Sequence, residues 1–201
     1  MTVKIAFSGA HGTGKTEAAD MLAAWFERRG TPVVRIPSAA RICPYPVNRD
    51  ATAEAQRWIW HRHALEEMDA EREARARGGV VICDRTLADC LVYSEWHGRE
   101  GVPGGDWDWV EGAQAVFTGT DLDGYSLIFL TEPRGPAPAD GFRDPGGEWR
   151  DVVAAFFRGW WDYVRGLREG TGLAGPPILA YEGPEQAARE AGRLACRNGR
   201  G

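Results

Sequence analysis

The chain has 201 residues, of which 43% are hydrophobic and 26% are charged. These proportions are ordinary for a globular protein, so they exclude wholesale disorder, and the length predicts one domain over residues 1–201. The formal net charge of −5 argues against a protein that coats nucleic acid, although it leaves a local basic groove open.

Cysteine and histidine spacing gives no sign of a metal site or a disulfide framework. Cys43, Cys83, Cys90 and Cys196 are scattered without a C-x-x-C pair, which indicates reduced thiols. The chain has no apolar run of membrane-span length and begins with a strand pattern rather than a signal peptide. We therefore expect a cytoplasmic protein with no membrane partner.

The first half of the chain alternates strands with helices. In chain order, the expected elements are a strand at 3–7, a glycine loop, a helix at 15–29, a strand at 32–36, an irregular stretch at 37–50, a helix at 52–77 and a strand at 80–83. Pro44 and Pro46 forbid a continuous helix between the second strand and the long helix. Thr52 is a candidate N-cap of that helix, and Gly78 ends it.

The second half continues the same alternation around a long loop. The expected elements are a helix at 88–95, a glycine-rich and then aromatic stretch at 97–108, a strand at 127–130, a loop at 132–147, a helix at 148–168, a strand at 178–181 and a closing helix from Pro184. Five strands in this order predict an α/β fold with a parallel sheet, in which ligands bind at the carboxyl ends of the strands.

The firmest motif is a phosphate-binding loop after the first strand, Gly9-Ala10-His11-Gly12-Thr13-Gly14-Lys15-Thr16. Its glycines permit a tight turn whose N–H groups face phosphate oxygens at a helix N-terminus. Lys15 supplies a charge to the β- and γ-phosphates, and Thr16 supplies a hydroxyl to Mg²⁺. We therefore predict binding of ATP or GTP with Mg²⁺.

A dinucleotide-binding turn is the rival interpretation, because Gly12-Thr13-Gly14 contains the pattern G-x-G. That turn needs a third small residue three positions later, where this chain has Glu17. The phosphate loop is therefore the preferred interpretation.

Asp84 and Arg85 follow the third strand and so face the same rim as the phosphate loop. Asp84 can orient Mg²⁺ or accept a proton from an attacking hydroxyl, so it is a catalytic and metal candidate. Arg85 could pair with Asp84 or contact a substrate phosphate. Asp89 could equally be a residue of the helix surface.

Arginines cluster in the loop after the fourth strand, which is long enough to form a lid over residues 132–150. Arg134, Arg143 and Arg150 are candidates for contacts to the transferred phosphate when the lid closes. Arg143 is the first choice because Gly141 beside it would let the backbone bend.

Aromatic and amide side chains could line the site of a phosphate acceptor. Five tryptophans could stack on a base or nicotinamide ring, although core packing explains most of them: Trp58, Trp60, Trp96, Trp107 and Trp109. Gln56 could bind the edge of a ring or lie on a helix surface. His61 and His63 do not share a helical face, so a metal pair is not expected.

With these motifs in place, the chain resembles the P-loop kinase-like NTPases related to ribosylnicotinamide kinase and, more distantly, thymidylate and deoxynucleoside kinases. The similarity covers most of the chain and rests on the phosphate loop, Ala39-Ala40-Arg41, residues 54–59, Cys83-Asp84-Arg85-Thr86, Asp89 with Tyr93, and Asp140-Gly141-Phe142-Arg143. Relatives often carry a glutamate just before Ala-Ala-Arg, where this chain has Ser38.

The resemblance implies a P-loop NTPase three-layer fold with a five-stranded parallel sheet and an arginine-containing lid. It also implies an acceptor site between the long helix and the Asp-Arg turn, with Arg41, Gln56, Arg85, Arg134 and Arg150 as substrate-binding residues. Lys15, Asp84, Arg85 and Arg143 would form the catalytic set.

Two functions follow as hypotheses. The first is a kinase that transfers the γ-phosphate to a nucleoside, nucleotide or nucleotide-like acceptor. A nucleic-acid acceptor is open but not favoured, and the sequence leaves a homodimer open. The second is a nucleotide-binding switch that signals through a partner without a small-molecule acceptor.

Overall fold

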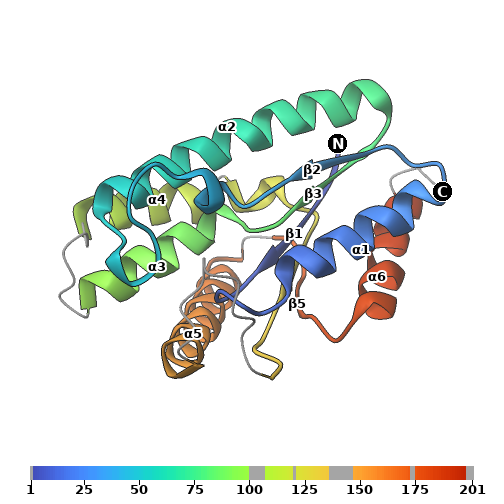
Figure 1. The fold of residues 1–201 in the computed structure, drawn as a ribbon. Coiled ribbons are helices and arrows are strands. Elements are labelled where there is room, and N and C mark those ends of the chain that lie inside the picture. The colour runs from blue at the N-terminus through green and yellow to red at the C-terminus, as the bar shows by residue number, and fades with distance from the viewer. Residues whose placement is uncertain (1, 100–106, 120, 136–146, 173–174, 198–201) are drawn as a thin grey trace.

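A computed structural model describes residues 2–99, 107–119, 121–135, 147–172 and 175–197. Five parallel strands form one sheet in the order β2-β3-β1-β4-β5 (Figure 1). The strands are β1 (Val3–Ser8), β2 (Val33–Ile36), β3 (Val80–Cys83), β4 (Leu127–Leu130) and β5 (Ile178–Ala180). This confirms the five predicted strands and the parallel α/β sheet.

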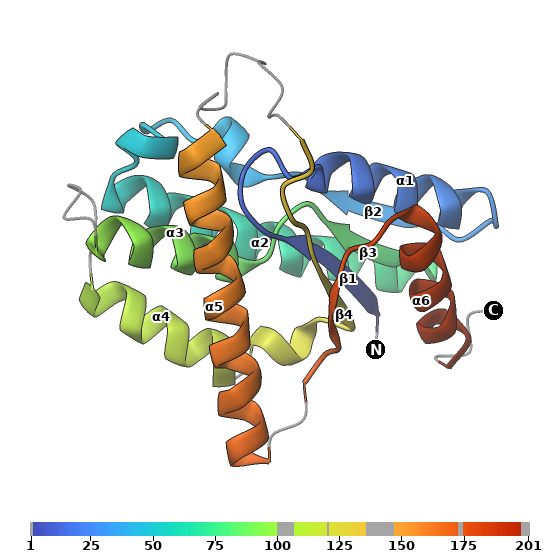
Figure 2. The same cartoon turned by 90° about the horizontal axis from the view of Figure 1, so that it is seen from below.

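Helices cover both faces of the sheet. They are α1 (Lys15–Glu27), α2 (Ala53–Arg77), α3 (Leu87–Arg99), α4 (Trp107–Gly119), α5 (Gly147–Thr171) and α6 (Pro184–Arg197). Alternate residues of the strands face opposite layers of helices. Ile5 and Ile82 pack with α1 and α6 on one face of the sheet, whereas Ala6 and Cys83 pack with α2–α5 on the other face. Figure 2 shows α3, α4 and α5 grouped away from α1 and α6.

The predicted boundaries of the long helix α2 are confirmed. The hydroxyl of Thr52 accepts a hydrogen bond from the N–H of Ala55 at 3.2 Å, which satisfies one of the unpaired donors of the first turn. Gly78 ends the helix in the left-handed conformation, with φ of 67°. Capping residues in the sequence therefore located both ends.

The structure differs from the sequence prediction in two loops. Helix α4 begins at the end of the stretch expected to be glycine-rich and aromatic (97–108) and continues through residues for which no element was predicted; among its described side chains, Val110 and Phe117, two turns apart, are buried. The stretch expected to be irregular contains two short 3₁₀ turns, η1 (Ala39–Ile42) and η2 (Asn48–Asp50). A third 3₁₀ turn, η3 (Asp121–Gly124), precedes β4.

Within the described ranges, no helix is both long and apolar enough to cross a membrane.

A buried ionic network ties α2 to the start of β1. The ammonium of Lys4 contacts the carboxylates of Glu67 at 2.8 Å and Glu71 at 2.7 Å, and lies 4.4 Å from the ring centre of Tyr125. The hydroxyl of Tyr125 donates to Glu67 and accepts from the N–H of Leu87. Each buried charge is thus paired, as burial requires.

Glu67 should make stability depend on acid pH. Burial alone raises the pKa of Glu67, but the hydrogen bonds and charges of His63 and Lys4 outweigh it and lower the pKa from 4.5 to about 2. Because the folded-state pKa is depressed, this stabilisation is complete above pH 4.5 and is lost as the pH falls toward 2.

We expect Glu67→Gln to lower the free energy of unfolding at neutral pH by roughly 2 kcal/mol and to flatten its decline below pH 4.5. Urea unfolding across pH measures both effects. Glu73→Gln is the matched control, because Glu73 pairs with Arg77 on the exposed side of the same helix. Parallel pH profiles for wild type and Glu67→Gln would contradict the expectation.

Candidate nucleotide and acceptor site

Three glycines shape the loop between β1 and α1. Gly9, Gly12 and Gly14 have φ values of 142°, 69° and 81°, which side chains rarely allow. A Cβ built on Gly9 would lie 2.5 Å from the carbonyl oxygen of Thr131 at the end of β4. The turn therefore needs glycine both for its conformation and for close contact with the neighbouring strand.

Lys15 begins α1 and is buried, with its side chain folded over the loop. Its ammonium donates to the carbonyl oxygens of Gly9, at 2.8 Å, and Ala10. Thr13 accepts from Lys15 at 3.3 Å. The cation is thus held inside the curve of the loop, at the helix N-terminus where an anion binds most readily.

The hydroxyl of Thr16 donates to the carboxylate of Asp84 at 2.6 Å. Asp84 is 2% exposed and directly follows β3, and its N–H donates to the carbonyl of Ile36 at the end of β2. The two predicted metal-binding residues therefore lie together. Hydroxyl and carboxylate oxygens are ligands that Mg²⁺ accepts, so the pair fits that ion.

Arg85 pairs with Asp89 rather than with Asp84. Its guanidinium contacts the Asp89 carboxylate at 2.9 Å and donates through Nε to the Ser38 hydroxyl at 3.0 Å. Burial lowers the pKa of Arg85, but Tyr93 and Asp89 more than offset this, so the net shift is upward. Its φ of 140° is strained for a residue with a side chain, which the surrounding contacts must maintain.

Asp89 is 1% exposed, so it is not a residue of the helix surface. Its other carboxylate oxygen accepts from the N–H and hydroxyl of Thr86, at 3.0 and 2.8 Å. Asp89 therefore caps the first turn of α3 and fixes the Arg85 guanidinium at once.

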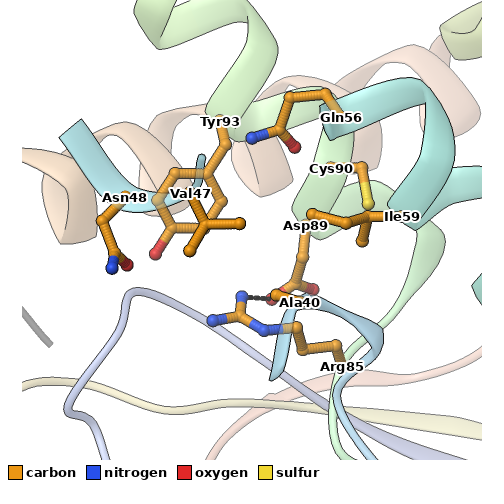
Figure 3. Close-up of a pocket in the computed structure, with 9 residues that line it drawn as sticks. All are labelled: Ala40, Val47, Asn48, Gln56, Ile59, Arg85, Asp89, Cys90 and Tyr93. Carbon is orange, nitrogen blue, oxygen red and sulfur yellow. Dashed lines mark hydrogen bonds and ion pairs between the residues drawn. The ribbon is translucent and has the colours of Figure 1, made fainter. Parts of the chain in front are cut away.

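A small cavity lies between α2, α3 and the two 3₁₀ turns, beside the Asp-Arg turn. Its volume is about 40 Å³, and its lining residues are Ala40, Val47, Asn48, Gln56, Ile59, Arg85, Asp89, Cys90 and Tyr93 (Figure 3). Gln56 is 6% exposed and lies in this lining, so it is not a residue of the helix surface. Gln56, Arg85 and Asp89 thus meet where the resemblance implied an acceptor site.

A second, larger hollow lies along the phosphate loop. It encloses about 980 Å³ and reaches from Gly12 and Thr16 to Arg41, Arg134 and Tyr181. The guanidinium of Arg134 lies 5.4 Å from the ring centre of Tyr181 and donates to its carbonyl oxygen. Arg134 thus lies on the phosphate-loop side, away from the small cavity. Arg41 is exposed on η1 at the edge of this hollow.

The remaining lid arginines are placed differently. Arg143, together with Gly141, lies outside the described residues. Arg150 is buried at the start of α5, where its guanidinium donates to the carbonyl of Gly135 at 2.8 Å and pairs with Asp151. A phosphate contact by either arginine stays a prediction.

Sequence reasoning missed Asn48, gave Tyr93 no role of its own and located the tryptophans only in general terms. Asn48 lines the small cavity in the left-handed conformation, with φ of 64°, and Tyr93 lines it while its hydroxyl contacts the phosphate loop. Asn48 gave no motif signal, and Tyr93 was noted only in the resemblance. Trp60, Trp96 and Trp109 pack in or against the hydrophobic core, as most of the tryptophans were expected to do.

A parallel sheet of order 2-3-1-4-5, with a glycine loop between β1 and α1, defines a P-loop NTPase-like α/β protein. The chain belongs to the AAA domain family, which matches residues 4–165. No curated protein matches the sequence.

Solved structures share the fold at low sequence identity. NadR protein in complex with NR is 20% identical with a TM-score of 0.61, over 96% of this chain and 51% of that chain. Deoxyadenosine kinase from M. mycoides with bound dATP is 10% identical with a TM-score of 0.55, over 98% of each chain. The chain therefore spans about half the length of the NadR protein.

We expect Gly9→Ala to destabilise the protein by roughly 2 kcal/mol or more, because the added Cβ meets the Thr131 carbonyl in a strained conformation. Gly112→Ala in α4 is the matched control, since nothing lies within 4 Å of its Cβ. The control should gain about 0.5–1 kcal/mol in helix propensity. Urea unfolding compares the two, and equal stabilities would be inconsistent with the close contact.

Proposed function

We propose that the chain is a P-loop kinase that transfers the γ-phosphate of ATP or GTP to a hydroxyl of a nucleoside-like small molecule. The main support for this proposal is that the small cavity and a hollow at the phosphate loop share part of their lining. Ala40, Asn48 and Arg85 line the small cavity and also line a hollow that contains the phosphate loop, Lys15 and Asp84. A donor phosphate and an acceptor placed in these two spaces would meet at that shared lining.

The donor side follows from the loop. The main-chain N–H groups and Lys15 would hold the β- and γ-phosphates, and Thr16 with Asp84 would hold Mg²⁺. Bound there, the ion would neutralise charge on the phosphate oxygens. Asp84 suits a metal-binding role, because one of its oxygens already accepts from Thr16 at 2.6 Å.

The acceptor side favours a hydroxyl over a phosphate as the attacking group. Among the described residues that line the small cavity, Arg85 is the one cation, and it is paired with Asp89 at 2.9 Å. A monophosphate dianion would find no net positive charge in this lining. An uncharged ring with donor and acceptor groups suits the Gln56 amide and the apolar side chains around it.

The acceptor must widen the cavity, because about 40 Å³ is far below the roughly 300 Å³ or more of ordinary ligand pockets. Residues 39–50 form one side and contain only short 3₁₀ turns, so they can move with less loss of hydrogen bonding than α2 or α3. In the transfer itself, a bond forms from the acceptor oxygen to the γ-phosphorus. The bond from the γ-phosphorus to the β–γ bridging oxygen breaks and the nucleoside diphosphate leaves, while the proton of the acceptor hydroxyl passes to the Asp84 carboxylate or to water.

The lid remains part of this proposal. We propose that residues 132–150 close over the transferred phosphate, with Arg143 as the closing cation and with Arg134 and Arg150 in support. We also propose that residues 1–201 act as one domain, because the helices on both faces pack on the same sheet.

The test is to incubate the protein with Mg²⁺, γ-labelled ATP or GTP and a panel of nucleosides, nucleotides, ribosylnicotinamide and short oligonucleotides. We expect label on a nucleoside-like acceptor. Lys15→Ala and Asp84→Asn should each lower that rate by about a hundredfold or more, because each removes charge aimed at the phosphates. Asp69→Asn, in an exposed pair with Arg72, should match wild type.

Two outcomes would overturn the proposal. Hydrolysis that no acceptor alters, without any labelled product, would indicate the nucleotide-binding switch instead. Wild-type rates in Lys15→Ala and Asp84→Asn would show that the site is elsewhere.

Gln56→Leu should raise the KM for the acceptor by about three- to tenfold, because a similar volume remains while the amide hydrogen bonds are lost. The KM for the triphosphate should change much less. Steady-state kinetics with each substrate varied in turn measures the difference. Gln114→Leu on α4, outside the cavity, is the matched control, and equal acceptor KM values in all three proteins would exclude a role for Gln56.

A further inference from the structure

We propose that Tyr93 couples acceptor binding to donor binding, because one side chain forms both the wall of the small cavity and a support of the phosphate loop. This inference rests on the proposed kinase function and names a positioning residue for it. Tyr93 would act on the phosphates only through the loop, without touching the transferred group.

The ring of Tyr93 belongs to the acceptor side. It projects from α3, one turn after Asp89, and lines the cavity together with Val47 and Gln56 (Figure 3). The guanidinium carbon of Arg85 lies 5.5 Å from the ring centre. Behind the cavity, Phe157 of α5 packs edge-on against the ring at 5.5 Å between centres. An acceptor ring in the cavity would therefore contact a tyrosine already held on its other sides.

The hydroxyl of Tyr93 belongs to the donor side. It accepts a hydrogen bond from the main-chain N–H of His11 at 2.9 Å and lies 3.4 Å from Nδ1 of the same residue. His11 is the third residue of the phosphate loop, and its imidazole stacks on Trp149 at 4.3 Å between ring centres. Tyr93 and Trp149 thus hold His11, and with it the part of the loop that would face the donor phosphates.

This double attachment gives a physical route for coupling. An acceptor packed on the ring restricts Tyr93, and the hydroxyl then restricts the His11 N–H and the loop around it. Donor phosphates bind better to a loop that is already ordered, because less conformational entropy remains to be lost. Linkage requires the reciprocal effect, so bound triphosphate must raise acceptor affinity by the same factor.

If Tyr93 had only a structural role, a different experimental result would be expected. Buried tyrosines generally need a partner for the hydroxyl, and the His11 N–H would meet that need without any coupling. Loss of the hydroxyl would then lower the melting temperature but leave the ratio of acceptor affinities with and without donor unchanged.

The experiment measures that ratio in Tyr93→Phe, which keeps the ring and removes the hydroxyl. Calorimetric titration gives the Kd of an acceptor that wild type phosphorylates, with and without an unreactive triphosphate analogue and Mg²⁺. We expect the analogue to tighten acceptor binding to wild type. In Tyr93→Phe this enhancement should fall by about three- to tenfold, the range of one hydrogen bond, while binding without analogue changes less than twofold. Tyr163→Phe, whose side chain is 55% exposed on α5, should keep the wild-type ratio.

Three results would overturn the inference. An unchanged ratio in Tyr93→Phe, with or without a lower melting temperature, assigns the tyrosine a structural role and leaves the proposed kinase intact. A wild-type ratio of one removes the coupling itself, again with the kinase intact. Transfer by wild type to no acceptor overturns the proposed function and, with it, the role of Tyr93.

Discussion

The hydrogen bond from Thr16 to Asp84, 2.6 Å long, joins the start of α1 to the end of β3. It closes one side of the phosphate loop, and Asp84 is followed at once by Arg85, which faces the small cavity. The parallel register of β1 and β3 makes this contact possible, because Ala6 aligns with Cys83 and both strands end at one rim. If that register changed, the residues of the phosphate loop and those of the small cavity would no longer lie side by side at one edge of the sheet.

Elements with local signals could be predicted from the sequence. Each strand is a short and mostly apolar run, Thr52 and Gly78 mark the ends of α2, and the phosphate loop carries its glycines at fixed spacing. The pairing of Thr16 with Asp84 also followed in outline, because Asp84 directly follows β3 and Thr16 ends the loop that follows β1, so both lie beyond the carboxyl ends of neighbouring parallel strands. For the strands, the helix ends and the phosphate loop, the sequence signal and the physical cause lie within a few residues of each other.

Other features depend on contacts between distant segments. Arg85 pairs with Asp89 rather than with Asp84, and its backbone has an unusual φ of 140°. No pattern in the sequence predicts that conformation. Asn48 reaches the cavity because a 3₁₀ turn folds across α3, and the Tyr93 hydroxyl finds His11 across 82 residues. Helix α4 escaped prediction because few of its residues are buried.

Both lysines of the chain, Lys4 and Lys15, are buried, with 4% and 5% of their surface exposed. The positive charge on the described surface is therefore carried by arginine, whose guanidinium does not react with ordinary amine reagents. Acylating or reductively methylating reagents would find no ready lysine side chain outside the ionic network of β1 and the phosphate loop. Covalent labelling of the lysine side chains would thus report on opening of those two regions rather than on the outer surface.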